Sequence, residues 1–400
     1  MRVRSPRHED DPRASASGSG FVYCLAVWLA VGTIVWLLAL WGPALLEPNR
    51  GQGVPGWPPP RPAAAPTALG SALERWDGLW YLRISTDGYR ETDGSAAFFP
   101  LYPLLVRAAA PLLGGHPLAA ALVLSHGATL AALLLLHRTV AADLGEGPAR
   151  RAVLYLALFP TSFFLYAPYA ESLLLLTSIA AMSFARQHRW ALAGGAAALA
   201  SATKAAGLVL FLPLAVEALR ALRQRPRERR FAALLPPLAA VAAAPLGAGL
   251  YLLYWHLRFA AAFAPVAQQT LWLRTPTWPW DTLQEATVTA WASLGAFPGG
   301  YHLIDWLIVC PMLALALWAT PRLPLPQRLY VWGGLLPPLV FVFPGRPLMS
   351  LPRFLLALWP LFAALALLVV RPGPRAALTS ISCGGLAVLT VLYVNWYWIF

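Results

Sequence analysis

The sequence predicts an all-α protein that crosses a membrane many times, and three features of its composition support this. Hydrophobic residues make up 58% of the 400-residue chain, and charged residues make up only 12%. Soluble domains carry about 25% charged residues. Apolar stretches of about 20 residues, long enough to span a bilayer as a helix, recur from near the start to the end. We therefore expect a single membrane domain, residues 21–400, after a disordered cytoplasmic N-terminus, residues 1–20.

Residues 47–113 are expected to form a large first extracytoplasmic loop that carries interfacial helices. The apolar run before it, residues 21–46, exceeds a signal-peptide core of about 7–15 residues, so we interpret it as a retained span with its N-terminus inside. The loop begins with a proline-rich stretch and then holds five of the chain's 17 carboxylates. Its last segment, residues 98–113, is short and interrupted by Pro100 and Pro103, which predicts a re-entrant or interfacial helix.

About eleven spans, within a range of ten to twelve, follow from the apolar runs and the positive charges. Short cytoplasmic loops are rich in lysine and arginine. If residues 98–113 do not span, nineteen of the 30 cations lie in short inside segments and the C-terminus lies outside. Beyond the first span, the expected spans are residues 116–137, 151–167, 169–185, 190–203, 207–222, 231–256, 301–319, 329–343, 354–370 and 376–396.

The charge balance and the cysteines exclude two other classes of protein. The formal net charge is +13, but the arginines lie in short loops between apolar runs, where they orient the chain in the membrane. We therefore predict no nucleic-acid partner. Cys24, Cys310 and Cys383 lie inside apolar runs without paired spacing, so neither a disulfide framework nor a zinc site is implied.

Some charged residues near the spans need a reason, because a charge inside a membrane segment costs about 2.5–3.5 kcal/mol on insertion scales. Glu171 lies in a very short outer turn and is either a water-facing turn residue or a functional acid. Lys204, the chain's one lysine, either snorkels to the interface or offers a compact charge to a phosphate. Glu217 and Asp305 are interpreted as solvated residues near span ends.

A helix is predicted around Asp77 in the first outer loop. Trp76, Trp80 and Ile84 recur at helical spacing and form an aromatic, apolar stripe, and Gly88 is the expected helix stop. Such a helix can lie flat at the membrane interface, with its aromatic rings at headgroup depth. That account explains the tryptophans but does not require an acid at position 77.

Several segments carry a family resemblance. The most specific is ERWDGLWYLRISTDGYR followed by AAFFPLYPLLVR; weaker segments are LFPTSFFLYAPYAES, RWALAGGAAALASATKAAGLVLFLPLA, AQQTLWLRTPTWPW and SLPRFLLALWPLF. In this order they resemble the PIG-V family of mannosyltransferases, the GPI mannosyltransferase 2-like branch of the GT-C membrane glycosyltransferases. The resemblance covers most of the chain from Glu74 to about Phe362.

The resemblance implies a GT-C fold and inverting transfer of mannose from a polyprenyl-phosphate donor, of dolichyl type in eukaryotes. By motif position Asp77 matches the family's catalytic aspartate, and Lys204 stands where arginine is expected in many relatives. The arginine, alanine and proline bias is similar to that of a high-GC bacterial chain, so the GPI acceptor is not carried across. The expected acceptor is a glycolipid or other extracytoplasmic glycan. The expected location is a cell membrane, or the endoplasmic reticulum membrane in a eukaryote, with an extracytoplasmic or lumenal active site.

The candidate site gathers residues from the predicted outer side. Asp77 is expected to act as base, because an alcohol is a poor nucleophile while it is protonated. The leaving lipid phosphate needs cations or N–H donors, for which Lys204, Arg353 and Arg274 are candidates. No cofactor is predicted, although a divalent metal held by Asp77 with Asp87 or Glu171 is an alternative. The residues expected to contact substrate are Trp76, Trp80, Tyr81, Tyr89, Glu171, Gln268 and Trp272.

Two rival functions remain open. A lipid or polysaccharide transporter needs an alternating pathway with charges at mid-membrane, whereas the unusual residues here are predicted to crowd one face. A non-catalytic membrane subunit would keep the spans without needing a base. Substitution of Asp77 with an assay of sugar transfer separates an enzyme from both.

Overall fold

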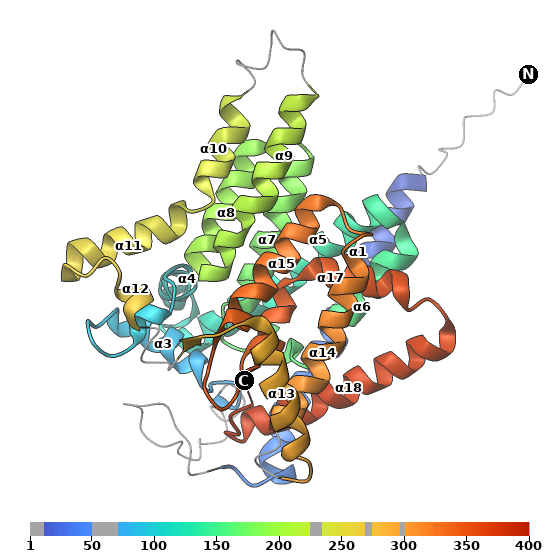
Figure 1. Ribbon diagram of the computed structural model, residues 1–400. Helices are drawn as coiled ribbons and strands as arrows, with labels where there is room; N and C mark the ends of the chain where they lie inside the picture. The colour runs from blue at the N-terminus through green and yellow to red at the C-terminus, as the bar shows by residue number, and fades with distance from the viewer. Residues whose placement is uncertain (1–11, 50–70, 225–233, 269–273, 297–300, 400) are drawn as a thin grey trace, which may run out of the picture.

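Helices make up most of this computed structural model (Figure 1). The structure describes residues 12–49, 71–224, 234–268, 274–296 and 301–399. The helices are α1(Pro12–Leu45), α3(Asp77–Asp87), α4(Leu101–Ala109), α5(Pro117–Leu144), α6(Glu146–Ala157), α7(Glu171–Arg186), α8(Trp190–Thr203), α9(Phe211–Arg223), α10(Leu235–Ala243), α11(Leu246–Phe259), α12(Ala264–Ala267), α13(Pro279–Ala292), α14(Tyr301–Ala319), α15(Leu325–Val340), α16(Leu351–Phe354), α17(Trp359–Leu368) and α18(Pro372–Val394). Short 3-10 segments are η1(Ser95–Ala97), η2(Ala110–Leu113), η3(Ser162–Leu165), η4(Ala205–Leu210) and η7(Leu355–Ala357), and strands β1(Thr275–Pro276) and β2(Phe341–Val342) pair antiparallel.

The all-α membrane architecture predicted from composition is confirmed, whereas the count of eleven spans stays a prediction. Within the described residues, five helices are long and apolar enough to cross a membrane, or up to seven if each of two bent pairs is one span. Four other predicted spans correspond to α6, α7, α8 and α15, which have 12, 16, 14 and 16 residues. These are shorter than the roughly 20 residues of a full span.

Proline and turn residues break three of the predicted spans. The span predicted for residues 151–167 ends at Ala157, because Pro160 interrupts the helix and the chain turns into the buried segment η3. Helices α10 and α11 meet at a 48° bend, and the pair Leu351–Ala357 and Trp359–Leu368 at 84°. Irregular backbone of this kind is tolerated at membrane depth where protein buries it.

Helix α13 differs from the sequence expectation. Helix α1 begins at Pro12, and the disorder predicted for residues 1–20 stays a prediction. Helix α13 was not predicted; it packs against α14 and α15. The proline-rich first half of the outer loop lies largely outside the described residues.

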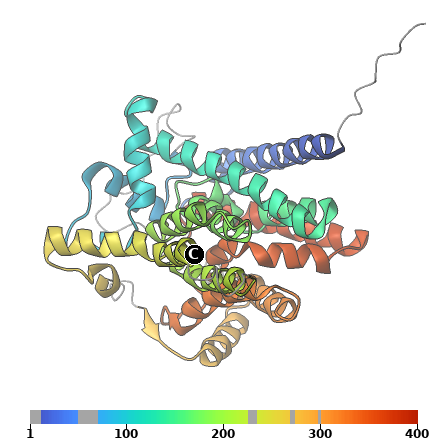
Figure 2. The same cartoon turned by 90° about the horizontal axis from the view of Figure 1, so that it is seen from above.

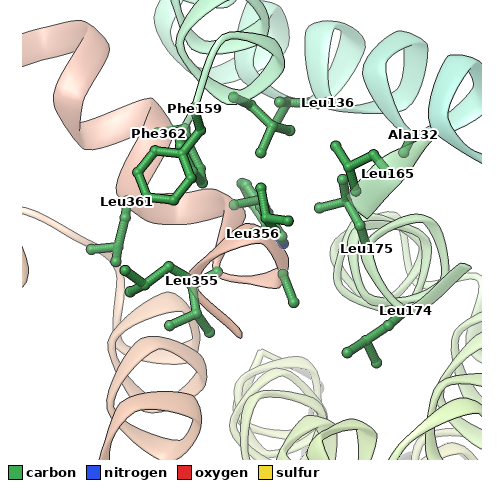
Figure 3. Packing of buried hydrophobic residues seen from close by; sticks show 14 of the residues in the cluster. Ala132, Leu136, Phe159, Leu165, Leu174, Leu175, Leu355, Leu356, Leu361 and Phe362 are labelled. Atoms are coloured by element: carbon green, nitrogen blue, oxygen red, sulfur yellow. The ribbon is translucent and has the colours of Figure 1, made fainter. Parts of the chain in front are cut away.

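The core lies where the irregular segment before α7 meets α5 and the turn between α16 and α17 (Figure 3). Phe159 and Phe362 pack edge to face there, with ring centroids 5.3 Å apart. Leu165 and Leu356 are fully buried beside them. This packing fixes the two non-helical segments against each other, which matters because both carry residues of the candidate site.

Helix α8 approaches its neighbours closely through small residues, as is common between membrane helices. A Cβ at Gly194 would lie 2.8 Å from the Cα of Ala240 in α10, and one at Gly247 would lie 2.1 Å from the carbonyl oxygen of Ala198. Figure 2 shows the helices coloured green around residue 200 nearly end-on within the bundle, whereas α11, in yellow, lies lengthwise across the view. The close packing leaves Lys204, at the end of α8, little freedom of position.

Candidate active site

Asp77 is the first residue of α3, and its neighbours hold the helix start in place. The preceding residue, Trp76, has a φ of 52°, a conformation that is uncommon for a residue other than glycine. Its ring packs against Trp396 and Trp398 at 5.5 and 6.3 Å. A Cβ at Gly78 would lie 3.0 Å from the Pro168 side chain. The motif Trp-Asp-Gly therefore combines a strained turn, a carboxylate and a close backbone approach.

The segment before α7 supports the same turn from the other side. Tyr169 donates its hydroxyl hydrogen to the carbonyl of Arg75 at 3.1 Å. Tyr393, from α18, donates to the carbonyl of Leu73 at 2.9 Å. Tyrosines that are distant in the sequence thus hydrogen-bond to carbonyls of the turn. These bonds restrict the position of the Asp77 carboxylate.

Arg353 reaches Asp77 from the opposite end of the sequence. Ser350 takes a left-handed φ of 68° and starts the short helix α16, and Thr161 donates a hydrogen bond to the carbonyl of Pro352 at 3.0 Å. Arg353, 7% exposed, donates from Nη1 to Oδ2 of Asp77 at 2.6 Å. The structure therefore brings these two motifs into direct contact, and the membrane face on which they lie stays a prediction.

Glu171 and Lys204 extend this pair into a network of four charges. Lys204 donates from Nζ to Oε1 of Glu171 at 2.7 Å, and Nε of Arg353 lies 3.3 Å from the same oxygen. Glu171 is 4% exposed, so its interpretation as a water-facing turn residue is wrong. Lys204 is also no snorkelling residue, because its ammonium is bound inside the protein.

Several polar atoms of the network have no hydrogen-bond partner. They are Oε2 of Glu171, Nε of Arg353, which lies near Glu171 without the geometry of a hydrogen bond, and Nε1 of Trp76. Buried polar groups are nearly always hydrogen-bonded, so each exception needs an explanation. The Asp77 side chain is 26% exposed and is open to an incoming molecule. The arrangement offers a reachable carboxylate beside buried donors that a ligand could satisfy.

Arg274 lies close enough to interact electrostatically with this network. Its Nη1 donates to the carbonyl of Phe341 at 3.1 Å, at the start of β2. Burial lowers the pKa of Arg274, the neighbouring charge of Arg353 lowers it further, and Asp77 opposes both. Its prediction as a phosphate ligand remains open, and the structure places it beside the candidate site.

Two of the four described aromatic residues that were predicted to contact substrate are buried in the protein. Trp80 is 4% exposed and stacks on Phe98 at 5.4 Å, so the Trp80 ring packs on protein and is not available to lipid headgroups. Tyr81 is buried against Tyr169 at 6.4 Å. Burial raises the pKa of the Tyr81 phenol, and the charges of Glu171 and Asp77 raise it further. Tyr81 therefore adjoins the site as a supporting group.

Tyr89 and Gln268 hold the outer loop together. Tyr89 donates to the carbonyl of Phe98 at 2.8 Å. Gln268 accepts from the backbone N–H of Ala96 at 3.2 Å and donates to the carbonyl of Glu91 at 2.6 Å. Within the described residues, neither side chain contacts Asp77, and Trp272 lies outside the described residues.

The site has an apolar wall that was not predicted from the sequence. The guanidinium carbon of Arg353 lies 5.4 Å from the ring centroids of both Phe164 and Phe354 and 5.6 Å from that of Tyr169. These rings limit the access of water to the cation. The segment LFPTSFFLYAPYAES carried the signal, but its hydropathy assigned it to predicted spans. Within the described residues, no group of three side chains has the composition of a metal site.

Comparisons with known proteins agree with this fold. The chain is similar to ArnT from Cupriavidus metallidurans bound to undecaprenyl phosphate, with a TM-score of 0.50 and 14% identity over 88% of this chain and 62% of that one. It is also similar to the Archaeoglobus fulgidus oligosaccharyltransferase, with a TM-score of 0.42 and 15% identity over 92% and 53% of the two chains. No curated protein sequence matches significantly.

The fold is thus that of the GT-C membrane glycosyltransferases. Within this class, residues 62–231 match the model of the family described as mannosyltransferase (PIG-V), which confirms the resemblance over that region. Asp77, Glu171 and Lys204 fall inside the match, and Arg353 lies beyond it. The chain spans about 62% of the length of the ArnT structure that it matches.

Proposed function

We propose that this protein is a membrane glycosyltransferase that moves a mannose from a polyprenyl-phosphate donor to a hydroxyl on an extracytoplasmic glycolipid or glycan. The observation that carries the proposal is the partly exposed carboxylate of Asp77, which lies beside the buried Nε of Arg353 and Nε1 of Trp76, neither of which has a hydrogen-bond partner. The family match and the GT-C fold support the sugar and the lipid-linked donor. The ArnT structure holds undecaprenyl phosphate as its own bound lipid.

Asp77 would act as general base. Its Oδ2 is held by Arg353, which orients the carboxylate and leaves Oδ1 for the acceptor. As the acceptor oxygen bonds to the anomeric carbon, its proton passes to Asp77. The bond from that carbon to the phosphate oxygen breaks, and its electron pair stays on the lipid phosphate. A single displacement of this kind inverts the anomeric configuration.

Arg353 and Lys204 would stabilise the leaving phosphate. Arg353 has donors that the protein leaves unused, and donors held in place where negative charge develops are the most effective source of electrostatic catalysis. Lys204 is bound to Glu171. Its positive charge would neutralise that carboxylate, which would otherwise repel the leaving phosphate. Arg274 is the third candidate cation.

The test of this function uses the full-length protein in membranes with a radiolabelled polyprenyl-phosphate mannose. We expect lipid-dependent transfer into a glycolipid fraction, and we expect no transfer from a water-soluble nucleotide sugar. A nucleotide sugar used equally well would reject the donor class. If neither donor is used and the glycolipid profile of the host is unchanged without the protein, a transporter or non-catalytic subunit becomes the better account.

A further inference from the structure

A cavity of about 670 Å³ lies at the opposite end of the helix bundle from Asp77. Helix α7 connects the two ends, because Glu171 begins it at the candidate site and Arg186 ends it at the cavity. At about 1.5 Å per residue, the helix separates them by roughly 24 Å. The positive-inside rule assigns this end to the cytoplasmic side of the membrane.

The cavity wall carries more positive than negative charge. Its charged side chains, with histidine neutral, are Arg186, Arg220, Arg322, Asp143 and Glu217. Arg186 is paired with Asp143, and Arg220 with Glu217. Among the described residues, Arg322 has no acidic partner: it donates to the carbonyl of Trp318 and lies over that ring. One cation is therefore left uncompensated at the wall.

The interior of the cavity is largely apolar, and one of its lining residues carries a buried polar group without a partner. Val140, Met182 and Leu214 supply apolar lining. Trp359 is 2% exposed, and its indole N–H has no hydrogen-bond partner. Gln327, which is 7% exposed, also lines the cavity. A buried donor without a partner is rare in native proteins, and the indole of Trp359 belongs to a residue that lines the same space as the cations.

We propose that this cavity binds the phosphate headgroup of an anionic lipid from the cytoplasmic leaflet. Basic pockets between transmembrane helices on this side are suited to acidic headgroups, and the guanidinium fork of arginine matches phosphate. The volume lies within the range of about 300–1,000 Å³ that is usual for small-molecule sites. The mixed lining suits an amphiphile better than a fully soluble anion. This site does not depend on the proposed sugar transfer.

Lipid retention by the full-length protein tests the proposal. The protein is equilibrated with phosphatidylglycerol or phosphatidylcholine in detergent, and bound lipid is counted by native mass spectrometry. We expect preferential retention of phosphatidylglycerol. Arg322→Gln should weaken it by about ten-fold, as the loss of a charge-assisted hydrogen bond implies. Ala221→Phe, which narrows the cavity and keeps every charge, should also weaken it. Arg375→Gln, an exposed cation on the same side but outside the cavity, is the matched control.

The contrary outcomes are equally specific. Equal retention of both lipids by the unaltered protein would overturn the proposal, as would retention of phosphatidylglycerol unchanged in Arg322→Gln and Ala221→Phe. Competition by glycerol phosphate as strong as by the intact lipid would replace a lipid site with a soluble-phosphate site. A co-purified polypeptide that the lipid does not displace would identify a protein partner instead. Thermal unfolding of each variant confirms that it is folded before its lipid count is used.

Discussion

Two buried arginines near the predicted outer face form ion pairs that differ in how completely they are satisfied. Arg346 donates to both oxygens of Asp305, at 2.7 and 3.0 Å, and to the carbonyls of Trp398 and Ile399. Arg353 donates one hydrogen bond to Asp77, and its Nε has no hydrogen-bond partner. The first pair uses nearly every donor and acceptor it has, whereas the second leaves several unused.

The contrast separates a structural pair from a site. Asp305 is 1% exposed, so its interpretation as a solvated residue is wrong. Its partner ties α14 to the C-terminal residues. Asp77, at 26% side-chain exposure, meets solvent and belongs to a network with orphaned atoms. Complete satisfaction indicates a role in holding the chain, and incomplete satisfaction beside an opening indicates a role in binding.

Breaking the satisfied pair should have the largest effect on stability. Asp305→Ala leaves the Arg346 guanidinium buried without its counter-charge, and such losses cost about 3–5 kcal/mol. We expect a large drop in the thermal unfolding temperature in detergent. The double variant Asp305→Leu with Arg346→Met should recover most of it, because an apolar pair of similar volume is often nearly neutral. An unchanged unfolding temperature in Asp305→Ala would contradict the structural role of the Asp305–Arg346 pair.

Removing Arg353 should chiefly affect transfer. Arg353→Ala deletes the donor that orients Asp77 and would contact the phosphate. A charge-assisted hydrogen bond is worth about 1.5–3 kcal/mol, so transfer should fall about ten-fold or more with a raised KM for the lipid donor. Lys204→Ala should behave similarly, and Lys204→Arg should retain more activity because the charge is kept. Unchanged donor dependence in both alanine variants would contradict these assignments.

Gly78 tests whether the position of Asp77 matters. In Gly78→Ala the new Cβ meets the Pro168 side chain at 3.0 Å, and overpacking typically costs about 1–3 kcal/mol. We expect a modest loss of stability with a several-fold loss of transfer. Gly127→Ala is the control, since a Cβ there meets nothing within 4 Å and alanine favours a helix by up to about 1 kcal/mol. Equal transfer rates and equal stabilities of the two variants would contradict the claim that catalysis depends on the position of the Asp77 carboxylate.

Asp87→Asn should have the smallest effect. Asp87 ends the same helix α3, is exposed, and pairs with Arg90 at 3.4 Å. Exposed ion pairs contribute about 0–1 kcal/mol. Thermal unfolding and transfer rate should therefore stay near those of the unaltered protein. A large loss of transfer would move the base from Asp77 to Asp87.

The sequence predicted which segments would meet, but not how their charges would pair. Positive-inside counting and the motif order placed Asp77, Glu171, Lys204 and Arg353 on one side, and the structure brings all four into one network. Exposure was harder to predict, because the partner of Asp305 lies 41 residues away in the sequence and local pattern carries no such information.

Aromatic stripes and proline breaks gave the other differences. Trp80 lies on an apolar stripe, and such a stripe is equally consistent with a helix at the membrane interface and with a helix packed on protein. The contacts of α3 with α4 and α5 show that it is packed on protein. Pro160 signalled a break in the span predicted for residues 151–167, but hydropathy outweighed it. The irregular segment that follows supplies Phe164 and Tyr169 to the site. The helix break and the apolar wall were therefore both missed because hydropathy favoured a continuous span here.

The central claim, that the unsatisfied network is catalytic while the satisfied pair is structural, is tested most directly by a paired measurement. Transfer rate and thermal unfolding are recorded for Asp77→Asn and Asp305→Asn prepared identically. General-base catalysis contributes about 10²–10⁴-fold, so Asp77→Asn should lose transfer by that range and unfold near the normal temperature. Asp305→Asn should unfold at a clearly lower temperature and, while folded, keep most of its transfer rate. Near-normal transfer by folded Asp77→Asn would contradict the account.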